Sequence, residues 1–478
     1  METDRPDKPS ADWEAMADSW ETVNDLVEGA QAVRDGGERY LPQFPNESDK
    51  DYDFRRSTAK YTNVYRDVVE GLASKPFSKE VAVGEDLPPS FDPLIEDIDG
   101  RGNHLHVFAS VTFFSGINKA IDWILVDYTR SEEELRTVED EARAGVRPFW
   151  VHIPAEKVIW IDSDVIEGRE QLTLVRIEET KSRIREYIRE GDRVTWNIWE
   201  ETNARDNSGH SLVWEITASG EITIGVIPMV PFITGRRKGK KWQFYPPMRD
   251  AADLQVELYQ QETALKYAKT MAAFPMLAGN GVEPDRDGAG RPQQVPVGPQ
   301  TVLYAPPNND GVHGEWSWIS PDASLLQFLA NDIDSTIKEL REIGRQPLTA
   351  QSGNLTVITT AFAAAKGNSA VQAWALELKD ALENALRLTA MWMNETVEPE
   401  VKIHTDFGVD DMDGESLDVL LRMRKLDEEG EPDISQKTLW EEFKRRGVLS
   451  AEFDPDLELE RLLDEMPGGE VLPDESAL

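Results

Sequence analysis

The sequence predicts an α+β protein in which long helices alternate with β-rich parts. Short runs of β-branched and aromatic residues, separated by polar turns, fill residues 147–234. Farther along, three long stretches carry apolar residues at the spacing of an amphipathic helix, at 245–273, 320–344 and 368–395. A Gly- and Pro-rich segment with β-like runs, 274–319, separates the first two. A chain of 478 residues is too long for one compact core, so we expect about three domains or one elongated subunit of several parts.

The composition excludes several classes of protein. The chain has no cysteine, so disulfides, thiolate metal sites and cysteine nucleophiles are absent. The first residues lack the basic start and the apolar stretch of a secretory signal. No apolar run approaches the ~20 residues that a membrane-spanning helix needs, and we expect no membrane partner.

The chain is strongly acidic, with a formal net charge of −39. This balance argues against tight binding of nucleic acid, which depends on clustered Lys and Arg that displace counterions. It does not exclude DNA that passes without sticking. Two interpretations remain open: a charge that keeps the protein soluble or suits a saline medium, and an acidic wall that repels DNA along a conduit.

The part before residue 147 is predicted to be mainly helical. Apolar spacing predicts helices at 12–36, 61–72 and 103–115, and a buried strand near 123–126. The acidic segment 131–145 is expected to be a solvated helix or loop.

The ends of the three long helices carry recognisable signals. Pro246-Pro247 opens the first, which at about 26 residues would be roughly 40 Å long. Ser320-Pro321 and Asn368-Ser369 provide N-caps for the second and third. The last part is acidic, and its expected features are short helices near 415–426 and 435–446 and a disordered tail at 465–478.

Residues 97–102, Asp-Ile-Asp-Gly-Arg-Gly, resemble the start of a calcium-binding loop. The match then fails, because Arg101 and Phe108 stand at the fifth and twelfth positions, where oxygen ligands are required. A turn that leads into a helix is therefore favoured.

The basic segment 235–241, Gly-Arg-Arg-Lys-Gly-Lys-Lys, is not a phosphate-binding Walker loop. Three residues separate its glycines where four are needed, and no hydroxyl residue follows the lysine. An exposed basic turn is favoured, and a nonspecific contact with DNA or an acidic neighbour is the alternative.

No pattern points to catalysis. His104 and His106 alternate without a third metal ligand nearby, so both are interpreted as structural. The serine nucleophile motif G-x-S-x-G is absent, and acidic residues are so frequent that no carboxylate pair stands out. We therefore expect no enzyme activity, no cofactor and no metal.

The order of parts resembles that of the portal proteins of tailed bacteriophages, in particular a siphophage-type branch. The resemblance covers most of residues 12–395 and rests on many short motifs in the same order. They are W-x6-W-x2-V-x2-L-x2-G from Trp13, RYLP, RRSTAKYTNVYRDVVEGLASKPF, DIDGRGNHLHVFA, WILVDY, RPFWVHIPAEKVIWI, IPMVPFITG, YPPMRDAADLQVELYQ and VPVGPQTVLYAP.

This resemblance implies a fold, an assembly and a set of partners. The assembly is a ring, usually a dodecamer, at one vertex of the virion capsid, made in the host cytoplasm, through which DNA is packaged and ejected. Its partners are the major capsid protein, the terminase large subunit, a head-tail adaptor and double-stranded DNA that passes nonspecifically. The implied parts are a wing (1–244, β-rich at 147–234), stem helix 1 (245–273), clip (274–319), stem helix 2 (320–344), tunnel loop (345–367), long wing helix (368–395) and crown with tail (396–478).

The same resemblance suggests which residues line the DNA channel. Isolated basic residues could touch phosphates transiently, and small or polar residues would suit a loop that changes shape as DNA passes. Solvated helix faces or ion pairs between subunits are the alternative for the basic residues. The candidates are Lys338, Arg341, Arg345, Gln351, Asn354, Thr356 and Lys366.

Two other functions compete with this one. The first is another virion component, such as an adaptor or tail protein, although such proteins are usually shorter. The second is a carbohydrate-active or carbohydrate-binding protein with a sugar platform formed by Trp196, Trp199 and Trp214. Tryptophans at strand spacing more often belong to a core, which is the favoured interpretation.

Overall fold

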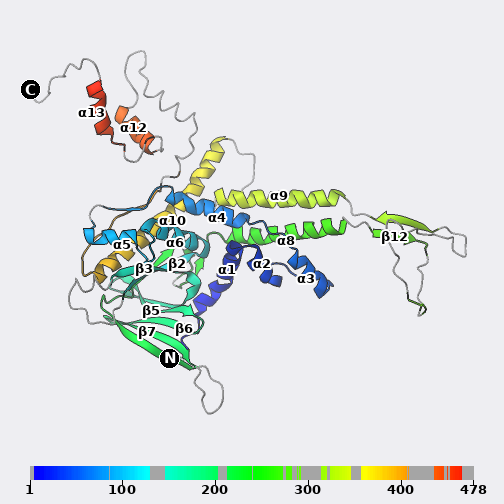
Figure 1. Ribbon diagram of the computed structural model, residues 1–478, viewed down its shortest axis with the longest axis horizontal. Coiled ribbons are helices and arrows are strands. Elements are labelled where there is room, and N and C mark those ends of the chain that lie inside the picture. Colours follow the sequence, from blue (N-terminus) through cyan, green and yellow to red (C-terminus); the bar gives the residue numbers. More distant parts are fainter. Residues whose placement is uncertain are drawn as a thin grey trace, which may run out of the picture.

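The structure is a computed structural model, and it mixes helices and sheets as the sequence predicts. In Figure 1 a body of helices and sheets carries a projection of two long helices, with a β-hairpin at its far end. The residues described are 5–84, 87–129, 146–202, 213–239, 241–272, 276–282, 288, 290–291, 314–319, 323–345, 357–405, 407, 435–445, 449 and 453–465.

The N-terminal part is helical, but its helices differ from those predicted. The expected helix at 12–36 is broken at Gly29, whose φ of 115° a residue with a side chain rarely adopts. The helix at residues 49–57 was not predicted, because most of its side chains are exposed and it has no apolar stripe. Ser48 caps this helix, and its Oγ accepts a hydrogen bond from Asp51 N. The helices are α1 (Ala11–Glu28), α2 (Ala30–Asp35), α3 (Asp49–Ser57), α4 (Val64–Ser74), α5 (Asp92–Glu96) and α6 (Leu105–Lys119), with short 3₁₀ turns at Gly37–Arg39, Lys75–Phe77, Pro89–Phe91 and Ala155–Lys157.

Helix α6 extends past the predicted end at residue 115. Gly116 lies inside the helix and packs closely on Phe232, so that a Cβ at this position would approach the phenyl ring to 2.4 Å. The glycine therefore permits a close contact between α6 and a strand and does not end the helix.

Two antiparallel sheets form the β-rich part and confirm that prediction. A three-stranded sheet has the order β3-β2-β9, and a five-stranded meander has the order β4-β5-β6-β7-β8. The strands are β2 (Ile121–Tyr128), β3 (Pro148–Ile153), β4 (Val158–Ile166), β5 (Arg169–Thr180), β6 (Arg183–Glu190), β7 (Arg193–Thr202), β8 (Val213–Ile222) and β9 (Met229–Ile233). Two short pairs accompany them, β1 (Ala82–Val83) with β14 (Val401–Lys402) and β10 (Arg236–Arg237) with β11 (Phe244–Tyr245).

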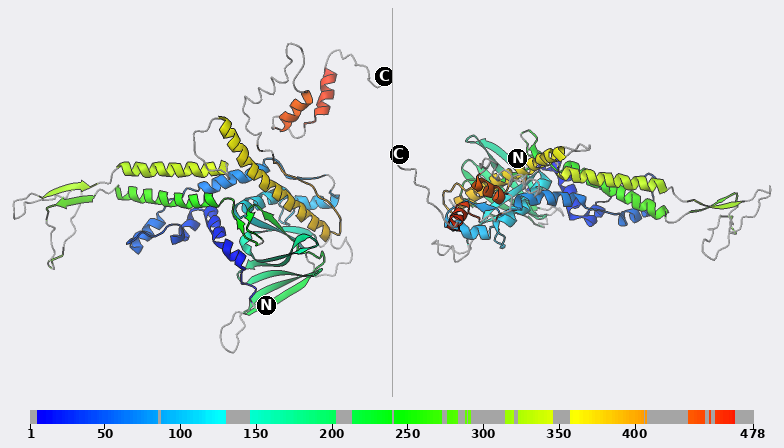
Figure 2. Two further views of the ribbon diagram at one scale, coloured as in Figure 1. Left: turned by 180° about the vertical axis from the view of Figure 1, so that it is seen from behind. Right: turned by 90° about the horizontal axis from the view of Figure 1, so that it is seen from above.

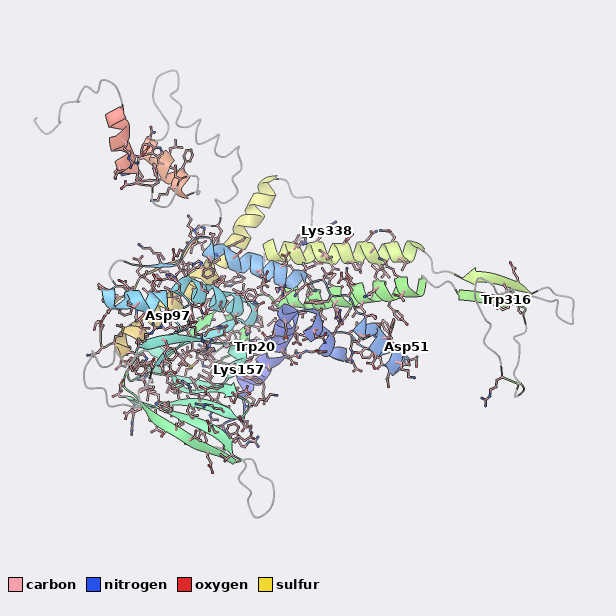
Figure 3. All side chains as sticks on the ribbon, in the orientation of Figure 1. Trp20, Asp51, Asp97, Lys157, Trp316 and Lys338 are labelled. Carbon is pink, nitrogen blue, oxygen red and sulfur yellow. The ribbon has the colours of Figure 1, made fainter. Side chains whose placement is uncertain are left out.

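Two long helices, α8 (Arg249–Ala272) and α9 (Ala323–Arg345), form the projection. They lie side by side in both Figure 1 and Figure 2. Strands β12 (Met276–Asn280) and β13 (Glu315–Ile319) pair antiparallel at their far end, where Figure 3 labels Trp316. Both helices and the hairpin were predicted.

The third long helix, α10 (Val357–Trp392), begins earlier than predicted. Asn368-Ser369 do not cap it, because the helix already includes residues 357–367. The alanines around Phe362 favour helix strongly enough to continue it through Gly367. Of the expected tunnel loop, 345–367, Arg345 is the last residue of α9, 346–356 lie outside the described residues and the rest is helical.

The C-terminal part contains α12 (Gln436–Arg445), which was predicted, and α13 (Pro455–Glu465), which was not. The segments expected at 131–145 and 415–426, and the tail after Glu465, lie outside the described residues. No described helix has both the length and the apolarity to cross a membrane.

The core has two connected regions. One lies among α4, α6, α8, α9 and α10, and the other between the two sheets and α1. Helix α10 joins the helices to the three-stranded sheet, because Trp150 Nε1 donates to Thr389 Oγ1 over 2.9 Å and Trp392 Nε1 donates to Val126 O over 3.0 Å. The projection therefore starts from a packed body.

Candidate functional site on the paired helices

Helices α8 and α9 hold each other through one shared apolar face. Leu258 and Leu265 of α8 and Ile333 and Leu340 of α9 are buried there. At 24 and 23 residues, the helices are each roughly 35 Å long at 1.5 Å per residue. A two-helix projection of this length leaves wide faces that the chain itself does not cover.

Glu262 of α8 attaches the projection to the body. The side chain is 3% exposed, and its carboxylate accepts hydrogen bonds from Thr62 N (2.9 Å) and Thr62 Oγ1 (2.7 Å). Lys60 Nζ lies 2.6 Å from Glu262 Oε1 and balances its charge. All these donors come from the short segment before α4.

Gln255 of α8, seven residues earlier, completes the attachment. Its Oε1 accepts from Val64 N (3.0 Å) and Tyr65 N (2.8 Å), and its Nε2 donates to Thr62 O (2.9 Å). Val64 and Tyr65 begin α4, so their N–H groups have no partner within that helix. We call Gln255 and Glu262, with their partners in residues 60–65, the polar joint.

An open groove of about 530 Å³ lies between α8 and α9 beside the polar joint. Its apolar lining includes Leu265, Ala330 and Ile333. Lys266 and Lys269, both exposed, stand at its edge together with Lys60. The groove thus combines an apolar floor with three lysines and two carboxylates, Glu262 and Asp334, on a chain that is acidic overall.

The predicted channel residues are only partly placed. Lys338 and Arg341 are exposed on α9, and Figure 3 shows Lys338 on this helix. Arg345 follows at the spacing of the same helix stripe, although its side chain lies outside the described residues. Within the described part of the chain, Lys338 and Arg341 form no ion pair. Gln351, Asn354 and Thr356 are outside the described residues, as is the side chain of Lys366 in α10.

The basic segment 235–241 forms a hairpin that is bound to the sheet. Arg237 donates to both carboxylate oxygens of Glu170, over 2.6 and 2.7 Å, and its guanidinium lies 4.6 Å from the ring centre of Trp242. The Arg237 guanidinium lowers the pKa of Glu170 from 4.5 to about 2. Arg237 therefore has a structural role in this turn.

The calcium-like segment is a turn, as favoured. Asp97 Oδ1 accepts from Gly102 N (2.6 Å), and Asp99 Oδ1 accepts from Arg101 N (2.9 Å). The turn leads into α6, where His104 Nδ1 accepts from His106 N (3.2 Å). Among the described residues no group of three or more His, Asp or Glu could hold a metal ion.

The tryptophans of the β-rich part do not share one face. Trp196 is 8% exposed and pairs across the sheet with Tyr187, whereas Trp199 Nε1 donates to Glu186, the preceding residue of β6. Successive residues of a strand point to opposite faces, so these two tryptophans serve opposite faces. The core interpretation therefore holds for Trp196, whereas Trp199 and Trp214 are half-buried on the other face, and a platform of all three is contradicted.

The sequence analysis missed the polar joint and the groove. Gln255 and Glu262 are seven residues apart, which places both on the buried face of α8. Two polar residues within an apolar stripe are the signal that could have revealed them. The groove gives no comparable signal, because its lining comes from α8, α9 and Lys60 together.

A family model described as a domain of unknown function (DUF4055) matches residues 247–393, which span α8, the hairpin, α9 and α10. No curated protein sequence matches the chain.

Three solved structures contain chains with a distant likeness. A chain of the "virion of native gene transfer agent (GTA) particle" is 12% identical with a TM-score of 0.38, and covers 91% of this chain and 99% of its own length. A chain of the "neck of empty GTA particle computed with C6 symmetry" is 12% identical, with a TM-score of 0.40 and coverages of 92% and 100%. A chain of the "neck of native GTA particle computed with C12 symmetry" is 11% identical, with a TM-score of 0.37 and coverages of 85% and 90%. TM-scores this low do not establish a shared fold.

The polar joint predicts that Glu262→Gln lowers the stability of the protein more than Glu70→Gln does. Glu262→Gln removes the buried charge and places an amide N–H₂ against donors, so we expect it to lower the free energy of unfolding by about 1 to 3 kcal/mol. Glu70→Gln on α4 is the matched control, because its ion pair with Arg66 is exposed and contributes little. Urea unfolding followed by circular dichroism measures both. Equal shifts for the two variants would contradict the joint.

The pair formed by Glu170 and Arg237 predicts that the stability of the protein depends on pH in the acid range. Because the folded pKa of Glu170, about 2, lies below 4.5, its contribution to stability is complete above pH 4.5 and is lost as the pH falls toward 2. The difference in urea midpoint between wild type and Glu170→Gln should therefore shrink across that window. Glu167→Gln in the neighbouring exposed turn is the control and should show no such trend.

Proposed function

We propose that this chain is a portal subunit, one copy of a ring through which DNA enters and leaves a tailed-bacteriophage-type capsid. The observation that carries the proposal is the projection. Two long helices leave a packed body, are joined at the far end by a β-hairpin and return to a third long helix. This is the order of stem, clip and wing that the sequence resemblance implies.

The surface of the projection suits assembly into a ring. The groove of α8 and α9 and the exposed side chain of Phe328 are not covered by the subunit itself, and copies arranged around an axis can cover them. Under this proposal α8 and α9 are the stem helices, residues 274–319 the clip and residues 396–478 the crown with tail. The tunnel loop is then confined to residues 346–356, because α10 begins at Val357.

The charge of the chain suits a channel that does not bind tightly to the DNA passing through it. The net charge of −39 opposes general binding of DNA. Lys338 and Arg341, with Arg345 at the next position of the stripe, could touch phosphates briefly. Terminase, the head-tail adaptor and the major capsid protein would be the protein partners of such a ring.

Ring formation is the first test. Mass photometry and negative-stain electron microscopy of the full chain should show closed rings, with a mass near twelve subunits and a central opening. A chain that stays monomeric at every salt and protein concentration would sink the portal proposal. Rings that fail to support DNA packaging in a reconstituted capsid would favour another neck component.

The channel assignment has its own test. Lys338→Gln with Arg341→Gln should leave ring mass and thermal stability unchanged, because both side chains are exposed. We expect the double variant to alter the amount of DNA retained in reconstituted capsids. Glu339→Gln, an exposed neighbour on the same helix, controls for loss of a surface charge. Unchanged retention in the double variant would remove these residues from the channel.

A further inference from the structure

The α8–α9 projection has two unlike sides. An α-helix advances about 100° per residue, so Phe328 points roughly half a turn away from both Ala330 and Ile333. Ala330 and Ile333 line the groove, and Phe328 therefore lies on the opposite side of α9. We call these the groove side and the ridge side.

The groove side carries more basic than acidic residues around an apolar floor. Leu265, Ala330 and Ile333 line the floor, Lys266 and Lys269 stand at the rim, and Asp334 also lines the groove. Among the residues that the structure describes, these two lysines have no carboxylate partner. Glu262 lies in the wall but is already bound by Lys60. The groove side thus offers an apolar site and positive charge that are not satisfied within the subunit.

The ridge side is acidic around an exposed aromatic ring. Phe328 is 67% exposed, and Asp332 lies one turn farther along the same face of α9. Gln261 Nε2 donates to Asp332 Oδ2 (3.0 Å) and to Glu257 Oε1 (3.2 Å), which places both carboxylates on this side. An aromatic side chain flanked by carboxylates matches the groove in both polarity and charge.

We infer that Phe328 of one copy inserts into the groove of the next copy, with Asp332 facing Lys266. The inference rests on the proposed ring. A head-to-tail contact uses two different patches on every copy, which is the arrangement found here. An aromatic residue seated in a pocket and surrounded by charges is also typical of the residues that dominate an interface.

The heights of the two patches agree with a closed ring. Copies in a ring are related by rotation without translation along the axis, so contacting patches lie at similar heights. Phe328 precedes Ala330 and Ile333 by two and five residues, roughly 3 to 8 Å along the helix. For a projection aligned with the ring axis, the ridge of one copy therefore meets the groove of its neighbour.

Cysteine crosslinking tests this contact directly, because the chain contains no native cysteine. The double variant Asp332→Cys, Lys266→Cys retains Phe328 and should give, under mild oxidation of assembled rings, a ladder of covalent oligomers. Each single variant should give none, since the two positions lie on different sides. The pair Asp332→Cys, Glu339→Cys is the matched control and should not crosslink, because Glu339 is exposed and lies seven residues from Asp332, on the ridge side of α9.

The outcomes separate this inference from the proposed function. Rings that form without the ladder would overturn the contact and leave the ring intact, whereas a monomeric wild type would overturn both. Dimers from the single variant Asp332→Cys would indicate a two-fold contact and contradict the head-to-tail arrangement.

A second measurement tests the aromatic anchor. Phe328→Ala should raise the protein concentration for half-assembly at least about tenfold, and higher salt should weaken assembly further. Val165→Ala on β4 is the control, because Val165 is 69% exposed and distant from the projection. If Lys266→Gln with Lys269→Gln instead lowers DNA binding and leaves assembly unchanged, the groove is a DNA site and the inference fails.

Discussion

The polar joint is the constraint on which the shape of the molecule depends. The direction of the two-helix projection depends on where its helices meet the body, and α8 meets the segment before α4 at the polar joint. There Glu262 and Gln255 satisfy backbone groups that neither helix can satisfy alone. A buried carboxylate that loses its donors is strongly destabilising, so the joint forms as a unit. Because α4 also packs on α9, fixing α8 against α4 orients the whole pair.

The same helices divide their surface among different tasks. The shared apolar face holds α8 to α9. The groove side and the ridge side differ in charge, and Lys338 lies one turn beyond Asp334 of the groove lining on α9. In the proposed ring, the groove and ridge sides would meet neighbours, and the basic residues farther along α9 would remain for the channel. One amphipathic pattern with a narrow apolar stripe therefore permits distinct surfaces on the same pair of helices.

The sequence predicts elements well where local pattern and packing agree. α8 and α9 follow from their apolar spacing, and the two sheets from alternating runs with polar turns. The predicted start of α10, at residue 368, was wrong. The prediction gave more weight to two good N-cap residues than to the helix preference of the alanines before them. The partners of Glu262 in the polar joint could not be predicted, because they lie about 200 residues away in the chain. Of the channel candidates, only Lys338 and Arg341 have described side chains on an exposed face.

In the portal that we propose, the net acidity and one short basic stripe would act together in a conduit. DNA affinity rises with each phosphate contact, so a continuous basic lining would hold DNA in place. The chain has 90 acidic and 51 basic residues, and this excess of acidic charge opposes general binding of DNA. The three basic positions 338, 341 and 345 on α9 would then give contacts that are each weak and are repeated around the ring. Such contacts could centre a moving duplex without stopping it, because each phosphate contact that is lost would be replaced by the next.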